Sequence, residues 1–345
     1  MYIPELTTHH HYLVVVLPKG LGFLDEAVED IKAMRVRGAA AIARYAVEVL
    51  RRIADEAEAD DPEGLFKLLE DASRKLLASR PTAVSLPNGI RFVMHRARRM
   101  LESSLTLGEF RRGLMEASDL FIERSMKAIE RISEYGSRRV EDGDSLLTHC
   151  NSSAVVGILK KALMDGKSFK VFITETRPLF QGRITARQLG EEGIETYLIV
   201  DSAARYFMNE VDKVIVGADA VAANGAVVNK IGTSMIALAA HEARTQFLVA
   251  AETFKFSPET MIGELVWIEE RGPDEVLPSG EREMIPLCQV RNPAFDVTPP
   301  EYIDAIITEE GVIPPQAAFH LMEEIFGDLT PEELASYKTL KPLDE

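Results

Sequence analysis

The sequence predicts an α/β protein in which a mainly helical N-terminal domain is followed by a Rossmann-like domain with a doubly wound parallel sheet. In roughly the first 140 residues, apolar side chains recur every three or four positions, which is typical of amphipathic helices. After that point, short runs rich in Val and Ile alternate with helical segments, and this alternation predicts a parallel sheet. We therefore expect two domains, residues 1–140 and 141–345, with a boundary near residues 137–143.

Three stretches of the N-terminal part carry the helical periodicity, and they are residues 24–53, 65–78 and 107–136. Between the second and the third, "RPTAVSLPNGI" contains two prolines and a glycine, so we expect a shaped loop that joins the start of a helix. A histidine triplet, residues 9–11, precedes the first stretch. No Cys, Asp or Glu follows it at a spacing that suits metal ligands, so we interpret it as a solvated segment and predict no metal site.

Five apolar runs in the C-terminal part are predicted strands. They are "SLLTHC", "KVFITET", "ETYLIVD", "KVIVGAD" and "TQFLVAAE". Each run is continuous rather than alternating, as in strands that are buried on both faces. Because ligands of an open parallel sheet bind beyond the carboxyl ends of its strands, side chains at those ends are candidates for a functional site. The strand ends supply Cys150, Glu175, Asp201, Asp219 and the "AAET" segment.

The composition limits the partners and the compartment. The chain has 345 residues, 46% of them hydrophobic, and a formal net charge of -16, so we expect neither nucleic acid nor an anionic membrane as a partner. An anionic substrate would need a locally positive pocket. No apolar run is long enough for a membrane span, and two cysteines suit a reducing compartment, so we expect a cytoplasmic protein.

Cys150 stands where a predicted strand ends and a helix begins. Ser152 and Ser153 suit a helix N-terminus, whose dipole would lower the pKa of the thiol and whose N–H groups can hold a phosphate. The neighbouring His149 should point away, because adjacent strand residues face opposite sides. A buried small hydrophobe is the alternative for Cys150, and residue patterns alone leave it open. Cys288 has no such context, and we interpret it as structural.

Asp219 follows the apolar run "VIVG" directly. Partial desolvation there should raise the pKa of its carboxyl, which would suit a proton donor, although a cap or loop anchor is the alternative. Asp201 is equally well placed to cap the helix that follows it. The sequence contains neither "GxxxxGK[ST]" nor "GxGxxG", so nothing indicates ATP or NAD, and we predict no cofactor.

Basic residues at the ends of predicted helices and strands, or in loops, could form the positive pocket that an anionic substrate requires. They are Arg37, Arg80, Lys230 and Lys255. Arg37 and Arg80 rank highest, because a glycine or a proline fixes the adjoining backbone and a guanidinium fork suits a phosphate. Arg37 and Gly38 precede a helix rich in small residues, which predicts another anion site.

Seven segments together resemble the sugar-phosphate isomerase and initiation-factor-2B superfamily, in matching order from about residue 24 to about residue 327. They are "RVRGAAAIA", "RPTAVSLPN", "LTHCNSSA", "TETRPLFQGRITARQL", "VIVGADAVAANGAVVNKIGTSMIALAA", "AAETFKF" and "RNPAFDVTPPEYIDAIITEEGVIPP". The superfamily has three classes: ribose-1,5-bisphosphate isomerases, methylthioribose-1-phosphate isomerases of methionine salvage, and non-enzymatic regulatory subunits of the translation-initiation exchange factor. The resemblance therefore implies either a sugar-phosphate isomerase or a regulatory subunit.

Motif details separate the three classes. Both isomerase classes keep the cysteine of "THC" and the aspartate of "GAD", whereas regulatory subunits typically lack that cysteine; this chain has Cys150 and Asp219. Methylthioribose-phosphate isomerases usually read "GADR", but Ala220 follows the acid here. Ser152 and Ser153 suit a second phosphate better than a methylthio group, and Lys255 adds a cation. The resemblance thus favours the bisphosphate class, with the other two classes as alternatives.

The resemblance also implies a mechanism and a set of site residues. Asp219 would supply the acid that opens the sugar ring, and Cys150 as thiolate would take the proton from C2, giving a phosphoenolate and then the 2-ketose. Substrate-binding residues would be Arg37, Gly38, Ala39, Ala40, Arg80, Ser152, Ser153, Asn229, Lys230 and Lys255, although Ala39 and Ala40 offer little by their side chains. The family further implies AMP activation, homo-oligomers (dimers or hexamers) and a place in nucleotide salvage leading to Rubisco.

Overall fold

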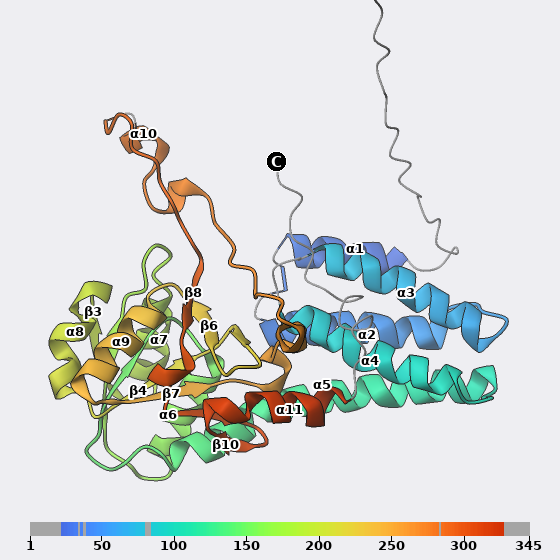
Figure 1. Ribbon diagram of the computed structural model, residues 1–345, viewed down its shortest axis with the longest axis horizontal. Helices are drawn as coiled ribbons and strands as arrows, with labels where there is room; N and C mark the ends of the chain where they lie inside the picture. The colour runs from blue at the N-terminus through green and yellow to red at the C-terminus, as the bar shows by residue number, and fades with distance from the viewer. Residues whose placement is uncertain (1–21, 34, 37–38, 80–83, 283, 328–345) are drawn as a thin grey trace, which may run out of the picture.

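The computed structural model describes residues 22–33, 35–36, 39–79, 84–282 and 284–327, and it has a helical part and a sheet part (Figure 1). The helical part is a bundle of five helices. They are α1 Gly22–Lys32, α2 Ala39–Glu56, α3 Pro62–Ser79, α4 Ser85–Leu101 and α5 Leu107–Ser137. Their apolar stripes meet in one core that includes Leu50, Leu69 and Phe121. Among the described residues, no helix is long and apolar enough to span a membrane.

Two expectations for the helical part need correction. The pattern over residues 24–53 forms two helices rather than one, with α1 ending at Lys32 and α2 beginning at Ala39. Most of the predicted loop "RPTAVSLPNGI" is helical, because α4 already begins at Ser85. Pro87 is compatible with this start, since the N–H groups of a first helical turn have no partner within the helix and a missing one costs nothing.

The main sheet has seven strands in the order β10-β9-β7-β4-β1-β2-β3. They are β1 Ser145–Thr148, β2 Lys170–Thr174, β3 Glu195–Ile199, β4 Lys213–Gly217, β7 Gln246–Ala250, β9 Ala305–Thr308 and β10 Gly311–Ile313. All neighbours pair in parallel except β10, which runs antiparallel to β9. The five predicted strands are confirmed, while β9 and β10 were not predicted. The order reverses between β1 and β4, which is the switch point where such sheets bind ligands.

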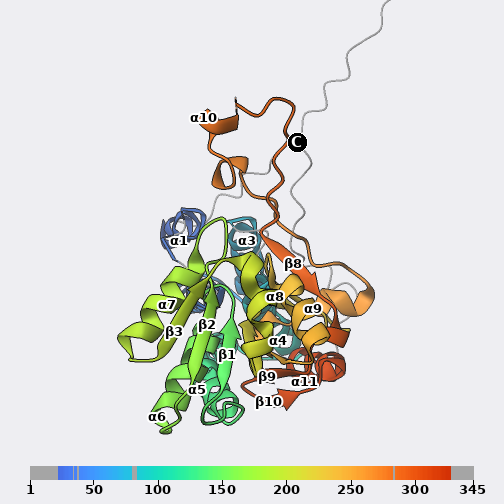
Figure 2. The same cartoon turned by 90° about the vertical axis from the view of Figure 1, so that its left-hand side faces the viewer.

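Helices cover both faces of this sheet, as Figure 2 shows, so the predicted doubly wound α/β class is confirmed. They are α6 Ser153–Met164 and α7 Gln181–Glu191 on one face, and α8 Ala204–Phe207, α9 Thr233–Ala243 and α11 Ala318–Phe326 on the other. Successive residues of a strand point to opposite faces of the sheet and belong to different hydrophobic cores. Leu146 packs in the core that includes Ile158 of α6, and Leu147 packs in the core that includes Ile236 of α9. Burial on both faces explains the continuous apolar runs of β1, β2, β4 and β7. The same expectation is wrong for β3, which lies at the edge of the sheet and is largely exposed.

A small antiparallel sheet, which the sequence did not reveal, leans on the α9 side. Its strands are β5 Ala220–Val221, β6 Val227–Lys230 and β8 Phe295–Thr298, in the order β5-β6-β8. Between the 3-10 helix η4 (Pro258–Ile262) and β8, the chain extends away from the body to the short helix α10 (Ser279–Arg282), as Figure 1 shows. The small sheet therefore carries both the segment that follows Asp219 and the predicted pair Asn229 and Lys230.

The helical part is closely attached to the sheet part. α5 packs along α6, where Gly136 lies against Ile158 and Gly157 lies against Ser133, and a Cβ on either glycine would collide with that neighbour. On α4, the buried Arg91 forms an ion pair with Glu259 of η4, and Asn88 donates to the carbonyls of Phe254 and Phe256. The division into two domains near residue 140 stays a prediction.

Candidate active site

Cys150 and Asp219 lie at the carboxyl ends of β1 and β4, the two adjacent strands at the switch point. Cys150 follows β1 by two residues, and Asp219 lies between β4 and β5, where its N–H donates to the carbonyl of Val228 at 2.9 Å. The charges of Lys230, Asp219 and Asp201 all act on the thiol of Cys150. The fold thus gathers a thiol, two carboxylates and an ammonium at one sheet edge.

The backbone of Cys150 is held in the left-handed region, with φ of 69°. For a residue with a Cβ this conformation costs about 1–2 kcal/mol. Two hydroxyls hold it there: the Cys150 N–H donates to Thr176 Oγ1 at 2.9 Å, and Thr185 Oγ1 donates to the Cys150 carbonyl at 2.7 Å. The half-buried thiol is therefore mounted on a backbone that the fold constrains from both sides.

The predicted lowering of the Cys150 pKa is wrong. The pKa of the thiol is raised to about 11, mainly by burial and also by Asp219 and Asp201, against the opposing effects of the Asn151 N–H and of Lys230. The start of α6 at Ser153, with Ser152 as N-cap, agrees with the prediction, so burial of the thiol is what reverses the expected direction of the shift. Ser152 is the N-cap, and its Oγ accepts from the Val155 N–H at 3.4 Å.

His149 is buried and engaged away from the thiol. Its Nδ1 lies 2.6 Å from Thr174 Oγ1, and its Nε2 lies 2.9 Å from the carbonyl of Ile231. Since a carbonyl can only accept, Nε2 carries the hydrogen. Burial lowers the pKa of the imidazole, which keeps it neutral. These contacts agree with the expectation that His149 and Cys150 form no catalytic dyad.

Asp201 anchors a loop and does not cap a helix. Its two carboxylate oxygens accept from the backbone N–H groups of Thr176 and Arg177, each at 2.7 Å. Its own helical turn, η1 (Asp201–Ala203), has no side-chain cap. The sequence left open whether Asp201 caps a helix, and these contacts show that it does not. Its side chain instead anchors the loop after β2 to the end of β3.

Both serines lie at the start of α6, so the anion site predicted there stays a prediction. Ser152 is half-buried at the N-cap and Ser153 is exposed in the first turn. The sequence analysis missed the role of Gly217, the last residue of β4. A Cβ on Gly217 would lie 2.6 Å from Ser152 Oγ, so only glycine lets β4 approach the helix start this closely.

The remaining predicted ligands differ in how available their polar atoms are. Asn229 is buried and donates to Thr233 Oγ1 at 2.9 Å, and Lys230 is buried with its ammonium 4.8 Å from the ring centre of Phe295. Lys255 pairs with Glu252 at 2.8 Å. Burial alone would lower the pKa of Lys255, but the carboxylates of Glu252, Asp219 and Glu309 outweigh it and raise the pKa.

Ala39 and Ala40 form the first turn of α2, and both are half-buried. Arg37, Gly38 and Arg80 lie outside the described residues, as do the three N-terminal histidines. Cys288 is exposed, so its interpretation as structural is wrong. Within the described ranges, no three His, Cys, Asp or Glu side chains are grouped as metal ligands.

Gln181, the first residue of α7, was missed by the sequence analysis. Its side-chain oxygen is buried and has no hydrogen-bond partner among the described residues. Gln181 and Thr185 are four residues apart on α7 and share a helix face, and Thr185 contacts the Cys150 carbonyl. Gly182 next to it packs so tightly on the carbonyl of Thr174 that a Cβ would collide. The sequence does contain a pattern that could have indicated Gln181. It is a polar residue at the start of the helix that follows a buried strand, with a glycine directly after it.

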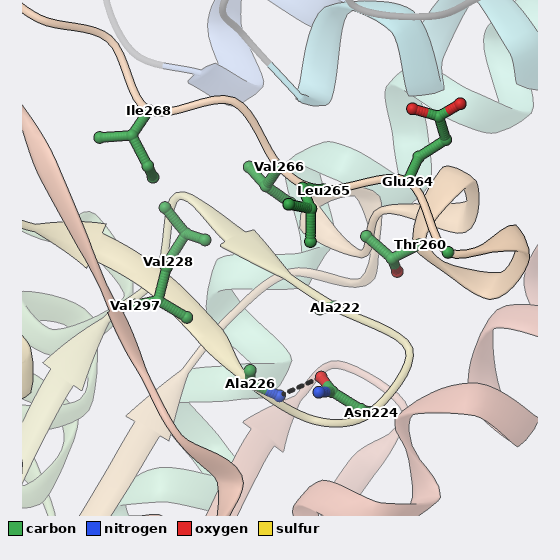
Figure 3. Close-up of a pocket in the computed structure, with 11 residues that line it drawn as sticks. Ala222, Asn224, Ala226, Val228, Thr260, Glu264, Leu265, Val266, Ile268 and Val297 are labelled. Atoms are coloured by element: carbon green, nitrogen blue, oxygen red, sulfur yellow. Dashed lines mark hydrogen bonds between the residues drawn. The ribbon is translucent and has the colours of Figure 1, made fainter.

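A separate apolar cavity of about 470 Å³ lies on the small antiparallel sheet (Figure 3). Its lining residues are Ala222, Asn224, Ala226, Val228, Thr260, Gly263, Glu264, Leu265, Val266, Ile268 and Val297. Val228 points into it, and the next residue along β6, Asn229, therefore faces the other side of the small sheet. None of these lining residues is a predicted site residue.

Comparison with known proteins gives three kinds of relative. The model of the initiation factor 2 subunit family matches residues 35–315. Ribose 1,5-bisphosphate isomerase of Pyrococcus furiosus is 52% identical over 303 residues, covering 88% of this chain and 94% of that protein. The structure of 5-methylthioribose 1-phosphate isomerase from Pyrococcus horikoshii OT3 is 34% identical with a TM-score of 0.68, covering 88% of this chain and 87% of that chain.

The third relative is the structure of translation initiation factor eIF-2B from Pyrococcus horikoshii OT3. It is 32% identical with a TM-score of 0.68, and the match covers 85% of this chain and 98% of that chain. Two enzymes and an initiation factor thus share the fold, so the fold alone does not decide between them.

Proposed function

The chain belongs to the initiation factor 2 subunit family, and from that premise we propose that it is an isomerase that converts ribose 1,5-bisphosphate to ribulose 1,5-bisphosphate. The observation that carries the proposal is the 52% identity to a ribose 1,5-bisphosphate isomerase over nearly the whole of both chains. Identity to the methylthioribose-phosphate isomerase and initiation-factor structures is 34% and 32%. The presence of Cys150 and Asp219 at the switch point favours an enzyme over a regulatory subunit.

In the proposed reaction, Asp219 begins protonated and Cys150 begins as a thiolate. Asp219 donates its proton to the ring oxygen as the bond from that oxygen to C1 breaks. Cys150 takes the proton from C2, and the electron pair of that C–H bond forms the C1=C2 double bond of the phosphoenolate. The carboxylate of Asp219 then takes the proton of the C2 hydroxyl while Cys150 returns a proton to C1. C2 becomes the ketone, the phosphate stays on C1, and both side chains regain their starting forms.

Two phosphates need two positive or N–H-rich places. We assign one phosphate to the start of α6, where Ser152, Ser153 and the free N–H groups of the first turn are suited to an anion. Lys230 lies close enough for its charge to act on the Cys150 thiol, so it would serve the same edge. Arg37, Gly38, Ala39, Ala40 and Arg80 complete the proposed set, together with Asn229 and Gln181 for sugar hydroxyls. Lys255, being paired with Glu252, would act through its charge on Asp219.

The deciding assay offers the purified protein ribose 1,5-bisphosphate and methylthioribose 1-phosphate separately. The proposal requires turnover of the first and a preference for it in kcat/KM. Cys150→Ser and Asp219→Asn should each lower kcat by at least about 100-fold, because each removes a proton-transfer group. Preference for methylthioribose 1-phosphate would show that the proposed substrate is wrong. Full activity in Cys150→Ser would show that the proposed mechanism is wrong. Binding to an initiation factor without turnover of either sugar would favour the regulatory alternative.

Some parts of the proposal rest on the family resemblance. They are AMP activation, assembly into dimers or hexamers, a cytoplasmic location and a role in nucleotide salvage. Isomerase rates with and without AMP test the first, and light scattering of the purified protein tests the second. An unchanged rate with AMP would remove the activation, and a monomer at all protein concentrations would remove the assembly.

A further inference from the structure

We propose that Thr176, Thr185 and Asp201 are positioning residues for the reaction, because together they hold the backbone of Cys150 in the conformation that aims its thiol. This inference rests on the proposed function, in which Cys150 is the base. Thr176 and Thr185 contact the backbone of Cys150 directly. Asp201 holds the Thr176 loop, and its charge also raises the thiol pKa.

The contacts form a chain across three adjacent strand ends. Thr176, after β2, accepts from the Cys150 N–H through Oγ1 at 2.9 Å, and the same hydroxyl donates to the Thr174 carbonyl at 3.2 Å. Since an N–H can only donate, Thr176 Oγ1 is the acceptor for Cys150, and its own hydrogen is left for the Thr174 carbonyl or for His149 Nδ1 at 3.5 Å. Asp201, after β3, fixes the N–H groups of Thr176 and Arg177 at 2.7 Å each. From the helix side, Thr185 of α7 donates to the Cys150 carbonyl at 2.7 Å.

The backbone conformations show that this chain of contacts works against an intrinsic preference. Both Cys150 and the β-branched Thr176 have positive φ, at 69° and 62°. Residues with a Cβ seldom adopt the left-handed backbone region, and β-branched residues adopt it even less often. Within the described ranges, five residues other than glycine have positive φ, and two of these five are hydrogen-bonded to each other at the candidate site. Strain of this kind persists where surrounding contacts over-determine it, and it concentrates at functional sites.

The direction of the thiol follows from the backbone. If Cys150 relaxed to an ordinary φ, its Cα–Cβ bond would turn and the sulfur would move away from its present half-buried place. A displacement of 1 Å at a reacting group can cost about 100-fold in rate. Loss of the hydroxyl of Thr176 or Thr185 should therefore affect the chemical step more than substrate binding.

The test uses a Cys288→Ser background, in which Cys150 is the single thiol of the chain. Thr176→Val and Thr185→Val remove one hydroxyl each and keep the shape of the side chain, while Thr176→Ser and Thr185→Ser are matched controls that retain it. Each valine variant should lower kcat by about 10- to 100-fold with KM within about threefold, and should speed alkylation of Cys150 by iodoacetamide. The serine variants should restore both values.

Several results would overturn the proposal. One is a valine variant with the kcat and the alkylation rate of the parent. Another is a fall in kcat without any change in alkylation, since the thiol would not have moved. A third is an equal loss in the serine variants, which would point to packing. If Thr176→Val does not fold, Thr185→Val and Asp201→Asn probe the same arrangement from other elements. If the parent protein does not isomerise the bisphosphate, the proposed function fails, but the alkylation rates still decide whether these residues position Cys150.

Discussion

The Cys150 thiol should titrate far above an ordinary cysteine, and alkylation kinetics of the Cys288→Ser protein would measure it directly. Burial raises the thiol pKa from 9.0 to about 11. At pH 8 such a thiol is about 0.1% thiolate, against about 9% for a thiol of ordinary pKa. The thiolate of higher pKa is the stronger nucleophile, with a Brønsted coefficient of about 0.4–0.5, which restores about eightfold. Cys150 should thus react about tenfold more slowly than a cysteine in an unstructured peptide.

The pH dependence separates the pKa from simple access. The rate for Cys150 should still rise about tenfold per unit between pH 9 and 10, whereas the peptide thiol levels off. Two variants check the cause: Asp219→Asn removes a carboxylate that raises the thiol pKa and should speed alkylation at pH 8, and Lys230→Met removes an ammonium that lowers it and should slow alkylation. A plateau below pH 9, or a shift of both variants in the same direction, would refute the electrostatic reasoning.

Two further predictions concern Gly217 and Asp296. Gly217→Ala should destabilise the protein by about 1–3 kcal/mol in urea titrations and raise KM for ribose 1,5-bisphosphate, because the new Cβ would lie 2.6 Å from Ser152 Oγ and push the start of α6; unchanged stability and KM would contradict it. Burial raises the pKa of Asp296 from 3.8 to about 6, so its native form favours the proton and stability is lost as the pH rises from about 4 to 6. Asp296→Asn should therefore gain stability relative to the parent over that range, as measured by urea unfolding at each pH; a difference that does not change with pH would contradict it.

Five of the seven strands of the main sheet were predictable, because each of these five is an apolar run that can be recognised by itself. Parallel strands buried on both faces are continuous apolar runs, so "KVFIT" and "FLVA" are recognisable without knowledge of their neighbours. Their shared carboxyl edge then follows from topology alone, which makes Cys150 and Asp219 candidates for a site, and the family resemblance adds the roles proposed for them. Chain order does not determine strand order, however, and their adjacency at the switch point required the structure.

The small antiparallel sheet and α4 were missed for different physical reasons. Strand β5 has two residues, too short for any periodic pattern, and its partner β6 pairs on the other side with β8, which lies more than sixty positions later in the chain. In α4, Pro87 and Gly89 are residues typical of loops, although they lie in the first turns of a helix. Gly89 is required there because a Cβ would lie 3.0 Å from Phe121 and 3.1 Å from Val47, so packing against α5 and α2 outweighs helix propensity.

The sign of the Cys150 pKa shift was beyond the sequence, because it depends on depth and on which residue caps α6. A neutral thiol does not conflict with its proposed role as base. In the proposed mechanism Asp219 holds a proton when Cys150 is a thiolate, and the form with a thiol and a carboxylate has the same number of protons, so transfer of one proton converts one form into the other. The Asp219 carboxylate raises the pKa of the Cys150 thiol. When Asp219 gives its proton to the ring oxygen or to Cys150, the pKa of the thiol therefore changes as well. Substrate phosphate at the start of α6 would be near this pair, and its binding would displace water and set which of the two forms prevails. An empty site that keeps the proton on sulfur also limits alkylation and oxidation of Cys150, since both require the thiolate.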